Sequence, residues 1–274
     1  MMVHPYGTSQ VLALTAAAAG SMSRAFAGRR GYHLMRLLSL VLLAVVWEWA
    51  GGRAGRALSF PRLSSVLWAL AARLADGEFW RAVWITVEAL SVGFGFTVVV
   101  GVLLGLVAGR VVTVQRLIDP YLHFLLSTPT SALVPVFIIV FGLGLAARAA
   151  TVAVFATPIL IVNTAAGARA VSPRLVEMAN SFGASGWQTL RHVVLPGALP
   201  GIVSGLRLAA GRAVVGMVVA ELILISVGLG KLISYYSATF DAANLFAVVI
   251  VVLTIGVLVA RGMAALERRV GRWR

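Results

Sequence analysis

The sequence contains no cysteine, which excludes disulfides and cysteine-ligated metal sites. Charged residues make up only 12% of the 274 residues, whereas soluble globular proteins carry roughly 25%. Its four histidines lie far apart along the chain and show no metal-ligand spacing. Residues 228–231 (GLGK) lack the first glycine of a phosphate-binding loop and a preceding strand. The chain is therefore expected to hold no metal, no nucleotide and no catalytic site of its own.

Long apolar runs fill most of the chain, and hydrophobic residues account for 60% of it. Runs of about 20 residues recur, each long enough to cross the hydrocarbon core of a bilayer. The pattern predicts an all-α membrane protein with six transmembrane helices in one domain, residues 34–265. The expected spans are residues 34–50, 80–109, 119–141, 148–168, 198–225 and 243–261.

Three shorter segments lie outside these spans. Residues 1–33 are expected to form a cytoplasmic tail, with an amphipathic membrane-surface helix as the alternative. Residues 63–74 are expected to form a short helix between the first two spans. Residues 266–274 form a basic cytoplasmic tail.

The net charge of +14 would suggest nucleic acid as a partner of a soluble protein. Here the basic residues cluster between and beyond the apolar runs, and no nucleic-acid partner is expected. Fourteen of the 23 basic residues fall in the two tails with the adjoining Arg36 and Arg261, the 110–116 turn and the polar segment around residues 169–191. The positive-inside rule then places both termini and this segment in the cytoplasm, with the lipid bilayer around the spans.

Glycine and proline mark the expected ends and contacts of the spans. Gly101, Gly105 and Gly109 recur every four residues, a small-residue ridge that lets a second helix approach closely. The pair Asp119–Pro120 is typical of a helix start. Gly142 and Gly144 predict a tight turn, and residues 226–242 are expected to form a polar turn.

The segment from Ser172 to Pro196, called the polar loop below, interrupts the apolar chain. A serine N-cap followed by proline predicts a helix from residue 173 to about 181, ended by a left-handed turn at Gly183. The pattern Ser185 to Gln188 predicts a capping box that opens a second helix. This second helix is expected to stop before Pro196. Taken alone, these signals also fit an ordinary cytoplasmic loop lying on the membrane.

The polar loop resembles the signature loop of the permease subunits of ABC importers. That signature reads Glu-Ala-Ala, three residues, Gly, nine residues, Ile, one residue, Leu-Pro. This chain has Glu177-Met178-Ala179, Gly183, Val193 and Leu195-Pro196 at the same spacing, with Met178 and Val193 as the two replacements. The resemblance covers roughly residues 58–274 and is closest to the nitrate/sulfonate/taurine-type subgroup. Further matching stretches are residues 129–144, 158–167, 205–221, 228–230 and 266–269.

The resemblance implies the type I ABC importer permease fold in the bacterial inner membrane. The polar loop would be a coupling helix that docks on a cytoplasmic ATPase subunit. Two such subunits would hold ATP and Mg, and this chain would hold no cofactor. A second permease copy, as a homodimer, and an extracytoplasmic substrate-binding protein would complete the assembly. The docking residues would be Glu177, Ala179, Gly183, Ala184, Trp187, Leu195 and Pro196.

Polar residues beside proline breaks in the spans are candidates for lining a pathway, because such breaks free backbone groups. These residues are Thr128, Thr130, Ser131, Asn163 and Thr164.

Four charged residues lie in the interior of the expected spans, away from the span ends, where charges are costly and are usually paired or functional. They are Glu88, Arg207, Arg212 and Glu221. Packing or pairing with a neighbouring span and lining of the pathway are both open for them. Relatives of the resembled subgroup carry an arginine near position 88, and an acid there does not favour a simple anion as the solute.

Two other functions compete with an importer permease. An ion-gradient-driven secondary transporter using Glu88 or Glu221 would need no ATPase, but no internal inverted repeat is evident. A membrane-embedded enzyme lacks a paired carboxylate, a Ser/His constellation and a metal cluster. The sequence leaves the solute open among sulfonates, taurine, nitrate, bicarbonate and pyrimidine-type vitamin precursors.

Overall fold

The computed structural model describes residues 29–53, 60–224 and 227–271. The expectations for residues 1–28 and 272–274 lie outside this range. The described chain is helical, and it divides into two compact units, residues 1–67 and 68–274. Its helices are α2 (Arg29–Arg53), α3 (Leu63–Leu74), α4 (Gly77–Arg110), α5 (Val112–Ser127), η1 (Thr130–Leu133), α6 (Val134–Phe141), α7 (Leu145–Arg169), α8 (Pro173–Ser181), α9 (Gly186–Thr189), η2 (Leu190–Val194), α10 (Leu195–Leu224), α11 (Gly228–Ala238) and α12 (Ala242–Gly271).

The first unit contains α2 and the beginning of α3. The carboxylate of Glu48 in α2 accepts hydrogen bonds from the backbone N–H (2.9 Å) and the hydroxyl (2.8 Å) of Ser64. Because the first amides of a helix have no partner within the helix, this carboxylate completes the start of α3. The short helix predicted at residues 63–74 is confirmed, and α2 continues past the expected stop at residue 50 to Arg53.

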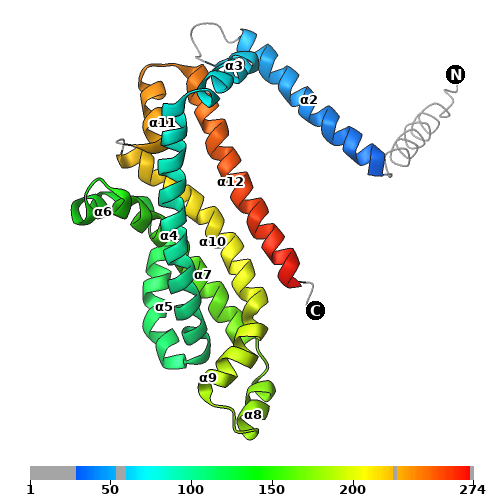
Figure 1. The fold of residues 1–274 in the computed structure, drawn as a ribbon, viewed down its shortest axis with the longest axis vertical. Helices are drawn as coiled ribbons and strands as arrows, with labels where there is room; N and C mark the ends of the chain where they lie inside the picture. Colours follow the sequence, from blue (N-terminus) through cyan, green and yellow to red (C-terminus); the bar gives the residue numbers. More distant parts are fainter. Residues whose placement is uncertain (1–28, 54–59, 225–226, 272–274) are drawn as a thin grey trace, which may run out of the picture. The chain divides into compact units, whose positions relative to one another are not determined.

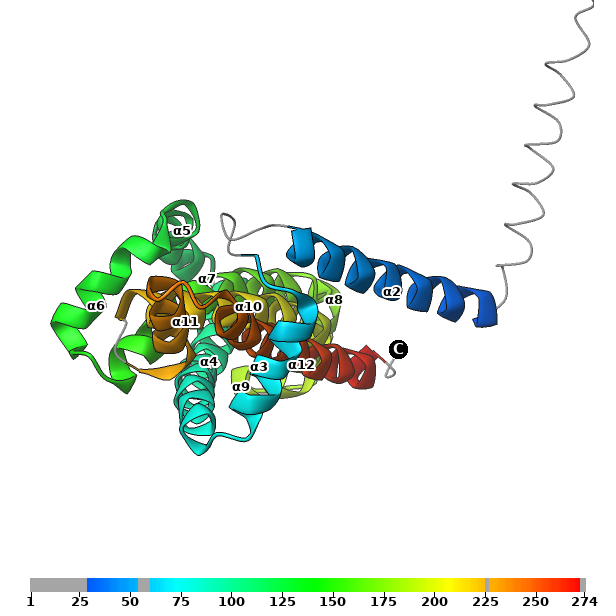
Figure 2. The same cartoon turned by 90° about the horizontal axis from the view of Figure 1, so that it is seen from above.

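The second unit is built around α7, which packs against α4 on one side and α10 on the other. These three helices lie side by side in both views (Figures 1 and 2). They share a buried core in which Leu90, Val152, Leu160 and Met217 are in contact through alanines of α7 and α10. The polar-loop helices α8 and α9 lie at one end of this bundle, here called the loop end, and α11 lies at the opposite end (Figure 1).

Glycines determine how closely the helices of the bundle approach, as the four-residue spacing of glycines predicted. A Cβ on Gly105 would lie 2.5 Å from the Cβ of Thr164, and one on Gly109 would lie 2.6 Å from the Cβ of Ala168. On the other side of α7, a Cβ on Gly201 would lie 2.6 Å from the Cα of Gly167. These distances are too short for any side chain, so backbone-to-backbone packing holds α4 and α10 against α7.

Five described helices are long and apolar enough to cross a membrane, and a sixth crossing is counted if the pair α5 and η1–α6 forms one span. That pair is bent by 99°, so the single helix expected over residues 119–141 is wrong. The break follows from Pro129, which forces Thr128 into an extended conformation with ψ of 144°.

The helix start expected at Asp119–Pro120 is also wrong, because α5 begins at Val112 and carries Pro120 inside it. Instead of capping a helix, the Asp119 side chain accepts a hydrogen bond of 3.3 Å from Gln115. Ile118 and Gln115 are half-buried and Leu122 is buried. The packing of this face outweighs the one backbone hydrogen bond that the proline removes.

The connection expected as a polar turn over residues 226–242 contains a helix, α11. Its residues Leu229 and Tyr236 are buried against Phe79 of α4 and Val248 of α12. The last span also runs further than predicted, because α12 continues from Ala242 to Gly271. Tertiary packing therefore orders a segment whose composition is typical of a loop.

We expect Gly105→Ala to destabilise the bundle by about 1–3 kcal/mol, the usual range for overpacking a closed contact. The added methyl group would overlap Thr164 and the backbone of Ile161. Thermal unfolding in detergent measures the effect. Gly95→Ala is the matched control, because a Cβ at Gly95 meets nothing within 4 Å. Equal unfolding temperatures for the two variants would contradict the role given to the ridge.

Candidate functional site

The polar loop begins as predicted. Ser172 is the N-cap of α8 and Pro173 is its first residue, although the serine hydroxyl makes no capping hydrogen bond. Glu177 and Met178 are exposed on this helix, whereas Ala179 is half-buried. Two signature positions, Glu177 and Ala179, thus differ in their exposure to solvent.

The turn after α8 is a Schellman motif. Gly183 has a positive φ of 75°, as predicted. Its N–H donates to the carbonyl of Asn180 (2.9 Å), and the N–H of Ala184 donates to the carbonyl of Ala179 (3.1 Å). These two hydrogen bonds define the motif and fix the direction in which the chain leaves the helix. The spacing from Ala179 to Gly183 in the sequence is therefore the spacing that this turn requires.

The second helix of the loop opens with the predicted capping box. The N–H of Gln188 donates to the hydroxyl of Ser185 (3.3 Å), and the N–H of Ser185 donates to the side-chain oxygen of Gln188 (2.7 Å). The hydroxyl of Thr189 donates to the side chain of Asn180 at 3.4 Å, which joins α9 to α8.

The predicted stop of this helix before Pro196 is wrong. Helix α9 continues through the π-helical turn η2 into α10, giving one helix of 39 residues from Gly186 to Leu224. In η2 the N–H of Leu195 donates to the carbonyl of Leu190, five residues earlier. This wider turn lies where the ring of Pro196 would meet the carbonyl of His192 in an α-helix, so the chain continues. Leu195 is half-buried and Pro196 is exposed.

Large apolar side chains are exposed on the polar loop. Phe182 is 85% exposed and Trp187 is 68% exposed, and Leu175 and Met178 are each about half exposed. Trp187, Leu190 and Val194 follow one another at helical spacing, but only Leu190 and Val194 pack inward. A 39-residue helix is nearly twice the ~20 residues that cross a bilayer core, so part of it projects beyond the core. The exposed apolar groups thus form a surface suited to a protein partner.

The candidate pathway residues fall into two groups. Thr128, Thr130 and Ser131 are half-buried at the sharp bend between α5 and α6. Asn163 lies where α7 meets Gly205 of α10, and its amide donates to the carbonyl of Ile159 at 2.7 Å.

Thr164, the fifth candidate, is fully buried against α4, and no described group bonds to its hydroxyl. Asn163 and Thr164 therefore lie in helix interfaces within this chain, whereas the three residues at the bend are partly open.

Three of the four intramembrane charges are at least partly exposed. Arg207 forms an ion pair of 3.0 Å with Glu267 of α12, and the two side chains are 57% and 39% exposed, so solvent screens the pair and it contributes little stability. Glu88 is half-buried and Arg212 is exposed. Neither of them has an ion pair or side-chain hydrogen bond to any residue in the described part of the chain.

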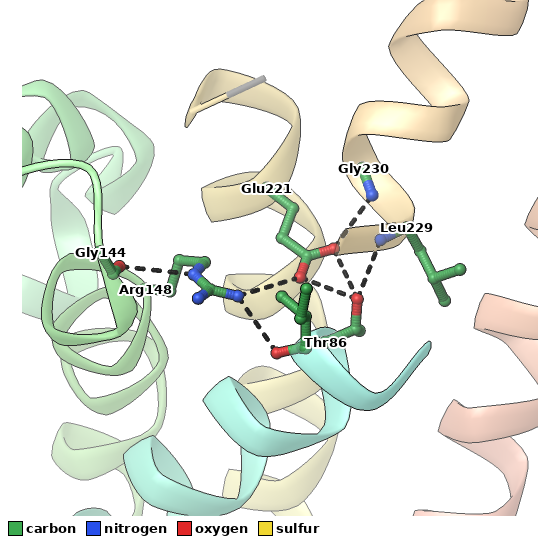
Figure 3. Close-up of polar contacts among 7 residues, drawn as sticks. Thr86, Gly144, Arg148, Glu221, Leu229 and Gly230 are labelled. Atoms are coloured by element: carbon green, nitrogen blue, oxygen red, sulfur yellow. Dashed lines mark hydrogen bonds and ion pairs between the residues drawn. The ribbon is translucent and has the colours of Figure 1, made fainter. Parts of the chain in front are cut away.

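Glu221 differs from these three, because it is only 1% exposed and is bonded from several helices (Figure 3). The hydroxyl of Thr86 lies 2.8 and 2.9 Å from its two oxygens. The N–H of Gly230 donates to the carboxylate at 3.0 Å, and the N–H of Leu229 donates to the Thr86 hydroxyl at 3.0 Å. Arg148 completes the group at 3.8 Å from Glu221. We call these five residues the Glu221 cluster.

The cluster joins four helices at the end of the bundle opposite the loop end. Thr86 comes from α4, Arg148 from α7, Glu221 from α10, and Leu229 and Gly230 from the first turn of α11. Arg148 also donates to the carbonyl of Ile85 at 3.1 Å. Pairing with a neighbouring span, one of the two roles left open for Glu221, is what its geometry shows.

Sequence reasoning missed the partners of Glu221, above all Arg148, the first residue of the span expected over residues 148–168. The available signal was the isolated arginine in the apolar run that begins at residue 145. A lone cation near the beginning of one span and a lone anion near the end of another are candidates for a pair when both lie toward the same side of the membrane. The amides of α11 carry no side-chain signal and could not be found in this way.

A pocket of about 330 Å³ lies beside the Glu221 cluster, between α4 and α11. Its floor includes Phe79, Ile85 and Gly228, and its rim includes the exposed side chains of Arg81 and Lys231. Burial raises the pKa of the nearby Tyr236 phenol in α11, which therefore stays neutral at physiological pH.

Comparison with known proteins agrees with the architecture. The family described as "binding-protein-dependent transport system inner membrane component" matches residues 101–272. An aliphatic sulfonates transport permease protein of Bacillus subtilis is 30% identical over 95% of this chain and 98% of its own length. The formylaminopyrimidine transport permease protein of Halalkalibacterium halodurans is 26% identical over 90% of this chain and 98% of its own.

Among solved structures, a chain of the MetNI methionine ABC transporter in an inward-facing conformation has the same fold. The TM-score is 0.60 at 22% identity, over 69% of this chain and 94% of that chain. The chain is therefore similar to transport permeases in sequence and to a chain of an ABC transporter in the arrangement of its helices.

We expect Gly183→Val to open the Schellman turn, because a branched side chain is strained by about 1–2 kcal/mol in the left-handed region. Space is not the limit, since nothing lies within 4 Å of a Cβ at Gly183. Hydrogen exchange at the amides of residues 183 and 184 should become about tenfold faster, because a decrease of ~1.4 kcal/mol in the free energy of opening the turn corresponds to that factor. Gly183→Asn is the control, because asparagine tolerates this conformation and should exchange nearly as the wild type does.

Proposed function

Because the chain belongs to the family of binding-protein-dependent transport system inner membrane components, we propose that its polar loop is the docking element for a cytoplasmic ATPase subunit. The protein is a multi-pass membrane permease subunit of an ABC importer, in the group that transports sulfonates, taurine and similar solutes. The structural likeness to a methionine ABC transporter chain supports the same type I fold.

The observation that carries the proposal is the exposure of apolar side chains on a rigid turn. Phe182 and Trp187 project from a segment whose geometry is fixed by the Schellman motif and the capping box. A loop that only lay on the membrane would need no such fixed turn. A rigid protrusion with an apolar tip suits the cleft of a protein partner, because aromatic residues contribute most to binding at protein interfaces.

Direct continuity between the loop and α10 supports a role in force transmission. Helix α9 enters α10 through η2 without a break. A displacement of the docking segment would therefore be passed along the backbone into the helix that packs on α7. ATP and Mg would be held in two ATPase subunits. Closure of these two subunits on each other would move two polar loops together.

We further place the polar loop and both termini on the cytoplasmic side. The last turns of α4, α7 and α12 carry Arg110, Arg169, and Arg268 with Arg269, in agreement with the positive-inside rule. The Glu221 cluster and the pocket beside it would then face the other side of the membrane, where an extracytoplasmic binding protein delivers the solute.

The pathway is proposed to pass the bend between α5 and α6, where a second copy of the chain would complete it. Irregular backbone at membrane depth is tolerated only where protein buries it or a water-filled cavity lies beside it. In this chain Pro129 is exposed and Thr128, Thr130 and Ser131 are half-buried, so one copy alone does not enclose the bend.

The solute is proposed to be a small sulfonate-like or vitamin-precursor-like molecule. The B. subtilis relative is named for aliphatic sulfonates, and the H. halodurans relative is named for formylaminopyrimidine, a pyrimidine compound. Glu88, half-buried in α4, does not favour a simple inorganic anion. The alternative of a secondary transporter driven through Glu221 is disfavoured, because that carboxylate is held by Thr86, Gly230 and Arg148.

We expect Phe182→Ala to weaken co-purification of the ATPase subunit by about tenfold, since truncating an aromatic anchor costs more than ~1 kcal/mol of binding free energy. The side chain is 85% exposed, so the permease itself should keep its unfolding temperature. Phe240, 81% exposed at the opposite end, provides the control variant Phe240→Ala, which should bind as the wild type does. Equal binding by both variants would assign the docking surface elsewhere.

The pathway is tested by thiol labelling, which is specific because the chain has no cysteine of its own. In the assembled transporter in lipid, Thr130→Cys and Ser131→Cys should react with a water-soluble maleimide. Thr164→Cys should not, because this residue is buried between α4 and α7. Protection of residues 130 and 131 together with labelling of residue 164 would overturn the proposed route.

A further inference from the structure

Helix α11 is attached to the bundle through the backbone of its first turn. The first amides of a helix have no partner inside it and carry partial positive charge. In α11 two of these amides, those of Leu229 and Gly230, donate to Thr86 and Glu221. The start of the helix is thus capped by side chains from α4 and α10, and no residue of α11 itself supplies the cap.

The contact between α11 and Glu221 is closed to any side chain. A Cβ on Gly228 would overlap the Glu221 carboxylate, and a Cβ on Gly230 would lie closer to Glu221 than real Cβ atoms approach their neighbours. Gly228 also has a positive φ of 76°. Glycine at both positions lets the backbone of α11 lie directly on the carboxylate.

Detaching α11 would leave several buried groups without partners. Glu221 is 1% exposed and Leu229 is fully buried, so water does not reach the contact. Separation would remove one amide donor from the carboxylate and leave the N–H of Leu229 unpaired. Unpaired buried polar and charged groups are among the most costly arrangements in proteins. The closed arrangement is therefore strongly favoured over an open one.

We propose, on the basis of the function proposed above, that Glu221 and Thr86, together with Arg148, are positioning residues that keep α11 fixed to the core throughout the transport cycle. Helix α11 then moves as one body with α4, α7 and α10, and is not an independent gate. Arg148 serves this role by balancing the Glu221 charge from α7 and by holding the carbonyl of Ile85 beside it. The pocket between Arg81 and Lys231 keeps its shape as a consequence.

The test measures the distance between α4 and α11 with spin labels, for which the cysteine-free chain is well suited. Arg81→Cys and Lys231→Cys place labels on exposed residues on the two sides of the pocket. In the permease assembled with its ATPase subunits, the distance distribution is recorded without nucleotide and with MgATP. A label at Ser181→Cys in the polar loop of each copy reports in parallel whether MgATP has moved the assembly.

We expect one narrow α4–α11 distance that is the same in both nucleotide states, while the distance between the two loops changes. A change of several ångströms in the wild-type α4–α11 distance would overturn the proposal and make α11 a gate. If MgATP changes neither distance and the ATPase subunits do not bind, the proposed function fails, and this outcome is distinct from a moving α11.

Thr86→Val and Thr86→Ser form a matched pair in the same experiment. Valine keeps the shape but removes the hydroxyl that bonds both Glu221 and Leu229, so a second, longer distance should appear. The ratio of attached to detached molecules should fall by about tenfold, as expected for losing a hydrogen bond to a charged group. Serine keeps the hydroxyl and should restore the single distance. An unchanged distribution in Thr86→Val would remove Thr86 from this role, and the wild-type measurement decides the proposal even if that variant does not fold.

Discussion

The close approach of three helix backbones is the constraint on which the rest of this structure depends. In a bilayer the lipid chains are as apolar as leucine, so burial of apolar side chains gives little drive for helices to associate. Helix α7 is instead held by glycines, with Gly105 and Gly109 of α4 on one side and Gly201 and Gly205 of α10 on the other. Because α5, α6, α11 and α12 all pack on this group, the positions of the bend, the loop and the Glu221 cluster follow from it.

Features determined by a few neighbouring residues could be predicted from the sequence. The turn at Gly183 and the capping box at Ser185 need only local hydrogen bonds, and both form as expected. The glycine ridge of α4 was likewise predictable, because a spacing of four residues places its members on one face of a helix. The structure adds the reason for the Ala179 to Gly183 spacing, since Ala179 accepts one of the two hydrogen bonds of the Schellman turn and Gly183 donates the other.

Features that depend on distant contacts could not be predicted in the same way. The sequence rules for proline predict helix boundaries at Pro120 and Pro196, but packing of α5 and the π-turn before α10 allow the helices to continue past them. The order of α11 comes from Phe79, Tyr236 and Val248, which are far apart in sequence. The Glu221 cluster includes two backbone amides, and no residue type indicates where an amide points. Proline and glycine rules state local preference, which tertiary packing overrides when enough surface is buried.

The unbroken course of α9, η2 and α10 has a mechanical consequence. Thirty-nine residues form this rod, and at a rise of 1.5 Å per residue its length is roughly 55–60 Å. A rod of that length acts as a lever, because a tilt of about 5° displaces one tip by roughly 5 Å relative to the other. The π-turn lies near one tip and Glu221 near the other, with the glycine contacts to α7 between them. A rotation of a few degrees about the glycine contacts with α7 can therefore move the far end of this helix by about the length of a side chain.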